Sequence, residues 1–413
     1  MRKPVFLLLL PGALAVLLVA WCLQHYPAHS VSLLRWDALW YESIRAGGYH
    51  FEADAKSNTG FFPLFSYLWR WLGLGPIGVS ILNGTLMLGA TYGLARQLRL
   101  WWPAVWLFVA LPTSVFFYVP YTEALFYAAA ALVVLGLARQ RPVLVVAGML
   151  LGGLVRPSAL YFLPAAVALG LVETTHCPAE WRRWLGRTAV YMAAAAAGIG
   201  LVMLEQWRST GVWQAYVKTQ LHWGHAFKLP TLSLTSVSQG IMLLDTLALL
   251  VGLAVGCWLL WVLVQRQRPA PEVVFAAGFV AATVLNTLLH APLLRGSTSL
   301  ISVARYVLCT PFFLVLLHYF LPRQRPSGLL LAATAAGGLA LVLLLGLWQM
   351  PVLYFRSLPG TAVSGPLLAL LVLGYTGLWA GTGYRLVRFS LYSMNMLLLL
   401  LLLRNYLLGF WVG

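Results

Sequence analysis

The sequence predicts an all-α protein built as a polytopic transmembrane helical bundle. Of its 413 residues, 61% are hydrophobic and only 9% are charged, whereas soluble domains average about 45–50% apolar and about 25% charged residues. Mean hydropathy is +0.84. Uncharged stretches long enough to cross a bilayer recur along the whole chain. These observations exclude a soluble globule, a disordered chain and a secreted disulfide scaffold.

The first apolar run, 5–23, follows Met1-Arg2-Lys3. It resembles a signal peptide, but about 19 residues is long for the apolar part of one, so we expect an uncleaved first span. The pair 142–155 and 157–172 is short and could be one broken helix or a re-entrant pair. With the first run, we expect about 13 spans in a single domain, 1–413. The further spans are expected at roughly 76–95, 101–118, 122–138, 142–155, 157–172, 188–206, 241–264, 272–290, 303–321, 328–349, 366–383 and 391–412.

Charge distribution predicts the orientation. With the N-terminus in the cytoplasm, the cytoplasmic loops hold 15 of the 27 Lys and Arg residues but only three of the ten acids. Short basic loops on the cytoplasmic side satisfy the positive-inside rule. We therefore expect a multi-pass membrane protein with a cytoplasmic N-terminus and the long polar segments on the opposite side. The net charge of +17 also invites a nucleic-acid interpretation, but the bases lie in small clusters at span ends, so membrane lipids and no nucleic acid are expected as partners.

The opposite, outer side carries the long polar segments, at about 24–75, 207–240 and 291–302, with a shorter one at 350–365. Long loops in a compact protein usually carry function. The first holds Arg35-Trp36-Asp37, then Trp40 and Tyr41. The helical spacing of these residues predicts a short amphipathic helix lying at the membrane interface.

Asp37 has two interpretations. It could pair with Arg35 or Arg45 at headgroup level. Alternatively, a carboxylate among Trp and Tyr side chains is partly desolvated and can act as a general base on a sugar hydroxyl. Aromatic rings beside a carboxylate are typical of carbohydrate sites.

Several motifs occur in order along the chain. WDALWYESIRAGGY followed by FFPLF resembles the opening of the PIG-V-type mannosyltransferases, which add the second mannose of the GPI anchor, and of their bacterial relatives. PYTEAL (120–125), GLVRPSAL (153–160), TQLHWG (219–224), ARYVLCTPFFLVL (304–316) and the ending YLLGFWVG resemble further segments of that family. The first match is the most specific. The family belongs to the GT-C class of integral-membrane glycosyltransferases.

The resemblance implies a GT-C fold and a hexosyltransferase. It implies that Asp37, in the first outer loop, is the catalytic base, and that the donor is a polyprenyl-phosphate sugar with mannose as the hexose. Gln220 and Trp223 then contact a sugar, Trp36 and Tyr41 help to shape its pocket, and Arg35 is a further candidate substrate ligand. The acceptor is expected to be an extracytoplasmic glycan or glycolipid, and the reaction to invert the anomeric centre. The sequence gives no indication of a partner subunit.

Other charged residues at outer span ends are candidate substrate ligands. Arg156 precedes Pro157, and a charge near membrane depth suggests function, such as binding a phosphate, unless it snorkels to the headgroups. Arg305 and Tyr306 follow Ser297, Thr298, Ser299 and Ser302; together they form a polar pocket or an interfacial anchor. Glu123 is either a helix-start acid or a second carboxylate near Asp37.

No cofactor and no metal are expected. Glu52-Ala53-Asp54 has the Glu-x-Asp form found in many GT-C enzymes but lies well downstream of Asp37. His222 and His225 lack an evident third ligand. No nucleotide-binding fingerprint or P-loop occurs, and the four cysteines form no zinc or disulfide pattern.

Two rival functions remain. One is a polytopic lipid or solute transporter, which would place ionisable residues in mid-membrane broken helices; only Asp245 suggests such a carboxylate. The other is a GT-C enzyme with a different sugar or a protein acceptor.

Overall fold

A computed structural model describes residues 3–176, 179, 181–232, 234–236, 242–294, 296–321, 336 and 385–412. In this part of the chain regular structure is almost entirely helical. The only strands there are β1 (Leu293–Leu294) and β2 (Ser297–Thr298), which form a small antiparallel hairpin. Apart from residue 336, the expected spans 328–349 and 366–383 and the outer segment 350–365 lie outside the described residues.

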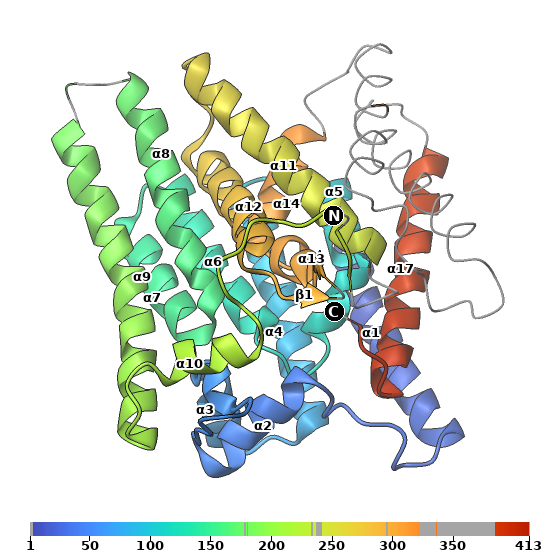
Figure 1. Cartoon of the computed structure of the whole chain (residues 1–413). Helices are drawn as coiled ribbons and strands as arrows, with labels where there is room; N and C mark the ends of the chain where they lie inside the picture. Colours follow the sequence, from blue (N-terminus) through green and yellow to red (C-terminus); the bar gives the residue numbers. More distant parts are fainter. Residues whose placement is uncertain are drawn as a thin grey trace.

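The long helices run roughly along one direction and form a bundle (Figure 1). They are α1 (Lys3–His25), α4 (Pro76–Gln97), α6 (Glu123–Ala138), α7 (Pro142–Val155), α8 (Phe162–His176), α9 (Trp181–Thr210), α11 (Met242–Val264), α12 (Pro271–His290), α14 (Pro311–Phe320) and α17 (Arg385–Leu407). Short helices fill the connections: α2 (Asp37–Gly47), α3 (Leu64–Leu72), α5 (Trp102–Val109), α10 (Ala215–His222) and α13 (Val303–Leu308).

Five segments are long and apolar enough to cross a bilayer: Pro76–Gln97, Pro157–Thr175, Trp181–Thr210, Leu244–Val264 and Pro271–His290. Shorter apolar helices accompany them, among them Glu123–Ala138 and Pro142–Val155. Their length and composition fit an integral membrane protein. The expected total of about 13 spans stays a prediction.

Proline interrupts several of the expected spans. The stretch 101–118 forms α5 and then a 3₁₀ helix, η2 (Pro112–Phe117), and 303–321 forms α13 and α14, the latter starting at Pro311. Proline lacks the N–H needed inside a helix and suits a helix start. The pair 142–155 and 157–172 is two helices rather than one. They meet at Arg156, which Pro157 holds in an extended conformation (φ −162°, ψ 155°).

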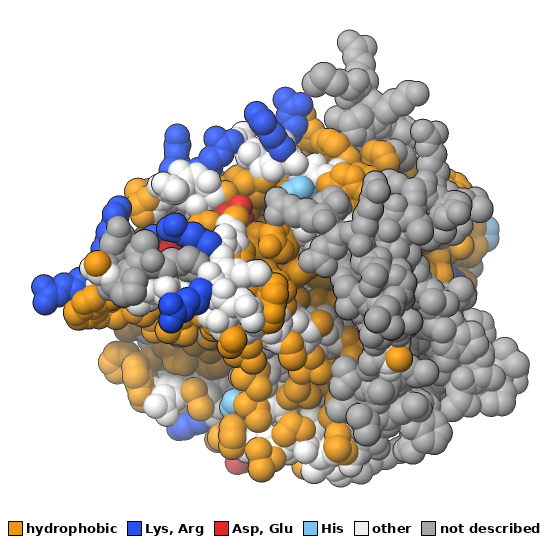
Figure 2. Space-filling model, turned by 90° about the horizontal axis from the view of Figure 1, so that it is seen from above, with side chains coloured by type: hydrophobic (Ala, Val, Ile, Leu, Met, Phe, Trp, Pro, Cys, Tyr) orange, Lys and Arg blue, Asp and Glu red, His pale blue; other side chains and the backbone are white. Residues whose placement is uncertain are grey.

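The two ends of the bundle differ. Helices α2, α3 and α10, from the first two long outer segments, lie together at the lower end in Figure 1. The upper end, seen in Figure 2, carries Lys and Arg side chains around its rim. Exposed arginines at helix ends there include Arg96, Arg141, Arg182 and Arg266. The loops that carry the candidate site residues are therefore gathered at the end opposite this basic rim.

Small residues allow close helix packing. A Cβ atom on Gly153 of α7 would lie 2.8 Å from the carbonyl oxygen of Ala195 in α9, and one on Gly198 would lie 2.4 Å from that of Leu150. Both are closer than real contacts. In membranes, where apolar burial between helices gives little driving force, such small residues let backbones approach and pack.

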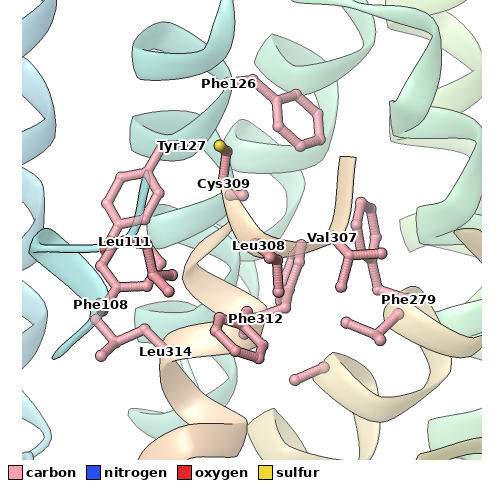
Figure 3. Close-up of a cluster of buried hydrophobic side chains, with 14 of the residues drawn as sticks. Phe108, Leu111, Phe126, Tyr127, Phe279, Val307, Leu308, Cys309, Phe312 and Leu314 are labelled. Carbon is pink, nitrogen blue, oxygen red and sulfur yellow. The ribbon is translucent and has the colours of Figure 1, made fainter. Parts of the chain in front are cut away.

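A dense apolar core surrounds the break between α13 and α14. Phe279 of α12 and Phe312 of α14 lie with ring centroids 4.4 Å apart, and Figure 3 shows Leu308 and Cys309 among the same cluster. Cys309 is buried, and its thiol donates to the Thr113 carbonyl. This packing holds α13 rigidly, and α13 carries Arg305.

Candidate functional site

Four charged side chains from separate parts of the sequence form one chain of ion pairs. Arg305 Nη1 donates to Asp37 Oδ2 over 2.7 Å, and Arg305 Nε donates to Glu123 Oε1. Arg156 Nη1 donates to the same Glu123 oxygen over 2.9 Å. The order is therefore Asp37–Arg305–Glu123–Arg156. Asp37 pairs with neither Arg35 nor Arg45, so the interpretation of Asp37 as their partner was wrong. Arg45 pairs with Glu42, and Arg35 donates to the Ser30 carbonyl.

The cluster is buried and balanced. The side chain of Glu123 is 0% exposed, that of Arg305 4%, that of Arg156 8% and that of Asp37 14%. Two carboxylates and two guanidiniums compensate each other, as buried charges require. Arg156 is thus not a snorkelling residue, and Arg305 is not a surface anchor. Asp37 is the most accessible member and the one open to a reaction partner.

Local structure fixes each of these groups. Asp37 and Glu123 are the first residues of α2 and α6, where a carboxylate is stabilised by the helix dipole. Glu123 therefore starts a helix, as one interpretation has it, and lies one guanidinium away from Asp37, but it does not line the cavity beside Asp37 as the other has it. Arg156 occupies the extended position before Pro157. Cation–π contacts assist: Arg305 lies 4.8 Å from the Tyr121 ring centroid and Arg156 5.0 Å from that of Tyr306.

A pocket of about 730 Å³ opens beside the cluster. Seven of the residues expected to act on substrate line it: Asp37, Tyr41, Arg156, Gln220, Trp223, Arg305 and Tyr306. Glu123 lies behind the two arginines and does not line it. Of the serine and threonine residues expected near Arg305, Ser302 is a lining residue, while Thr298 binds the backbone N–H of Thr231.

The pocket combines a charged end, aromatic walls and an apolar rim. Sequence reasoning missed the aromatic lining residues Tyr161 and Tyr216. Leu160, Leu285 and Leu221 also line it and are 44%, 58% and 59% exposed. These leucines come from η3 (Pro157–Tyr161), α12 and α10. Their exposure leaves an apolar rim on which an apolar chain can pack.

Tyr41 is held in place between the helices. Its ring is buried, and its hydroxyl lies 3.1 Å from the Thr122 hydroxyl, next to Glu123. Burial, together with the negative charges of Glu123 and Asp37, raises the pKa of Tyr41 above its usual range. The phenol therefore stays protonated and serves as a hydrogen-bonding wall residue rather than as a base.

The second outer segment is fastened to the first. The hydroxyls of Ser57, Thr59 and Thr219 lie within 3.0 Å of one another, and the Gln220 amide donates to the Gly60 carbonyl over 3.3 Å. Gly60 lies so close to α10 that an added Cβ would sit 3.2 Å from Thr219. This contact positions Gln220 and Trp223 in the pocket lining, with the Trp223 ring edge to face with Trp40 of α2.

Asp245, which sequence reasoning marked only as a candidate buried carboxylate, is a further functional candidate. It is fully buried and accepts hydrogen bonds from the Ser236 hydroxyl (2.8 Å) and from the backbone N–H of Ala304 (2.9 Å). Ser302, at the start of α13, makes no side-chain cap. Asp245 therefore caps α13 from another helix and fixes the residue before Arg305. Its signal in the sequence was a lone acid at the start of an apolar stretch.

Besides Glu123, two expected ligands lie outside the pocket lining. The Trp36 indole N–H donates to the Phe410 carbonyl over 3.2 Å, and the Arg35 guanidinium lies against Gly409. Both side chains contact the segment that follows α17. Glu52 and Asp54 are exposed in the first outer segment. Within the described residues no three His, Cys, Asp or Glu side chains gather as a metal site.

Comparison with protein-family models, with curated proteins and with solved structures finds no match to this chain.

Proposed function

We propose that this protein is a GT-C-type glycosyltransferase that moves a hexose, in the first instance mannose, from a polyprenyl-phosphate carrier to an acceptor glycan or glycolipid outside the bacterial inner membrane. One observation carries the proposal: a carboxylate, Asp37, shares a pocket with two buried guanidiniums, Arg156 and Arg305. A group that takes up a proton thus lies beside groups that bind phosphate.

The rest of the pocket suits a lipid-linked sugar. Aromatic side chains such as Tyr306 and Trp223 offer faces for the C–H surface of a sugar ring. The apolar rim at Leu160 and Leu285 gives the lipid chain a place at bilayer depth. A charged headgroup and an apolar tail are then both accommodated at once.

The proposed reaction is a single displacement. The acceptor hydroxyl gives its proton to Asp37 while its oxygen attacks the anomeric carbon. The bond from that carbon to the phosphate oxygen breaks, and polyprenyl phosphate leaves with the electron pair. Attack opposite the leaving group inverts the anomeric centre. Arg156 and Arg305 stabilise the charge that develops on the phosphate.

The ion pair between Arg305 and Asp37 gives the donor a second effect. While Arg305 donates to Oδ2, that oxygen is occupied. A phosphate in the pocket competes for the guanidinium and weakens its hold on Asp37. Donor binding thus frees the Asp37 carboxylate to accept a proton, whereas in the empty site the carboxylate stays paired with Arg305.

The experiment is turnover by purified protein reconstituted in sealed lipid vesicles. Short-chain polyprenyl-phosphate mannose with a radiolabelled sugar is supplied with a mixed glycolipid acceptor fraction, and released polyprenyl phosphate is quantified. Consumption of the donor with transfer of label supports the proposal. Accumulation of intact labelled donor across a sealed vesicle membrane, without cleavage, would instead support the transporter. Absence of both binding and cleavage for several lipid-phosphate sugars would refute the proposal.

A further inference from the structure

The segment that follows α17 reverses direction at the end of the helix, where the backbone makes a defined set of hydrogen bonds. Gly409 has φ +86°, its N–H binds the Tyr406 carbonyl, and the Phe410 N–H binds the Asn405 carbonyl. These two bonds form a Schellman motif with glycine in its left-handed position. The chain is thereby turned from the lower end of α17 back toward the middle of the bundle, near α13 (Figure 1).

That segment is fastened to the residues just before Asp37. The Ser32 N–H binds the Leu407 carbonyl over 3.1 Å, and the Tyr406 hydroxyl donates to the carbonyls of Leu33 (2.9 Å) and Arg35 (3.2 Å). With the bond from Trp36 to Phe410, these contacts involve four of the five residues at 32–36. These contacts span more than 370 positions in the sequence.

Trp411 reaches the pocket at this point. It is a lining residue, together with Asp37 and Arg305. Its ring meets that of Trp36 edge to face, with centroids 4.9 Å apart. Trp411 thus contacts the residue that directly precedes Asp37 and lines the same pocket as the Asp37 carboxylate. The acceptor hydroxyl must come within hydrogen-bonding distance of the same carboxylate, so the acceptor passes beside this ring.

We propose that Trp411 is an acceptor-binding and specificity-determining residue, whose indole packs against the apolar C–H face of the acceptor pyranose. Trp36 is a positioning residue that holds Trp411 in place. The inference rests on the proposed function, since it assigns the acceptor side of that site. The inference also gives a role to the contacts that Arg35 and Trp36 make with the segment that follows α17.

The test compares Trp411→Ala, Trp411→Phe and the matched control Phe410→Ala. Phe410 is 53% exposed, does not line the pocket, and keeps its backbone carbonyl in the control. We expect Trp411→Ala to raise the KM for the acceptor about three- to tenfold, as an aromatic contact implies. The KM for the donor and its slow hydrolysis without acceptor should stay unchanged. Trp411→Phe should recover most of the loss, and Phe410→Ala should resemble the unaltered protein.

An unchanged acceptor KM in Trp411→Ala, or an equal fall in donor hydrolysis, would overturn the inference, because the residue would then act only through structure. A second measurement does not depend on turnover: saturation-transfer NMR with methyl α-mannopyranoside as the probe. Contact with the unaltered protein that is lost in Trp411→Ala supports a sugar-binding Trp411 even if the donor is misassigned. Equal signals in both proteins, or none in either, overturn it. Failure of the proposed function is seen separately, as donor that is never cleaved.

Discussion

Arg305 donates to Asp37 Oδ2 over 2.7 Å through one nitrogen and to the fully buried Glu123 through another. One guanidinium therefore links the proposed base to the interior of the bundle. Glu123 is shared in turn with Arg156. The geometry of the pocket thus depends on a planar, forked cation at position 305, which lysine cannot reproduce.

Replacing Arg305 by Lys should lower kcat by about 100- to 1000-fold, the usual effect of losing one preorganised donor to a developing charge. A single ammonium keeps the charge but cannot bridge Asp37 and Glu123 in the same plane. The measurement is single-turnover transfer from a radiolabelled donor. Arg45→Lys, in an ion pair away from the pocket, is the control. Equal rates for Arg305→Lys and the control would contradict this prediction.

Arg156→Gln should have a similar effect on kcat while leaving the KM for the acceptor nearly unchanged. Arg156 lines the pocket but bonds only to Glu123 and not to Asp37, so its loss removes a phosphate ligand and leaves the base paired as before. Competition by inorganic phosphate with donor binding should weaken in parallel. A variant with a raised KM for the acceptor and an unchanged kcat would show that Arg156 binds the acceptor and not the donor phosphate.

Glu123→Gln should chiefly destabilise the fold. Removing one member of a buried ion pair typically costs about 3–5 kcal/mol, because the partner charges are left uncompensated. Here two arginines lose their common partner. Thermal unfolding of the detergent-solubilised protein should show a clearly lower midpoint, whereas Glu42→Gln, in a partly exposed pair, should shift it little.

Asp245→Ala should lower both stability and transfer. It leaves the buried N–H of Ala304 without an acceptor, at a cost of about 1–3 kcal/mol, and frees the start of α13 next to Arg305. Asp245→Asn keeps one oxygen acceptor and should fall between Asp245→Ala and the unaltered protein in both measurements. Loss of stability with full activity in Asp245→Ala would mean that the cap does not position Arg305.

Much of the helical fold could be predicted from apolar runs bounded by proline. The stretches expected at 76–95 and 142–155 correspond closely to α4 and α7, because proline at the first turn marks where each begins. The breaks inside 101–118 and 303–321 were not predicted. Both stretches are apolar throughout, and hydropathy alone does not distinguish a continuous helix from a short helix followed by a new turn.

The candidate site was predictable as a set of residue types but not as an arrangement. A charge at the end of an apolar run signals function, which marked Arg156 and Arg305. That Arg305 joins Glu123 and Asp37 across 182 and 268 positions follows only from tertiary packing. The aromatic residues Tyr161 and Tyr216 gave no signal, because such residues are common in apolar segments. Trp411 occurred in a recognised ending but had no site role until the structure brought it beside Trp36.

The central claim is that Asp37 takes a proton from the acceptor, and Asp37→Asn tests it most directly. Asparagine keeps the size of the side chain and an oxygen for Arg305 but cannot serve as the base. With Glu42→Gln on the same helix as the control, transfer of radiolabelled mannose should fall by about 100- to 10,000-fold in Asp37→Asn alone. Its donor binding should be preserved, and its midpoint of thermal unfolding should fall less than that of Glu123→Gln, because Arg305 keeps Glu123 as a partner. An Asp37→Asn protein that folds normally and transfers the sugar at the full rate would contradict the account.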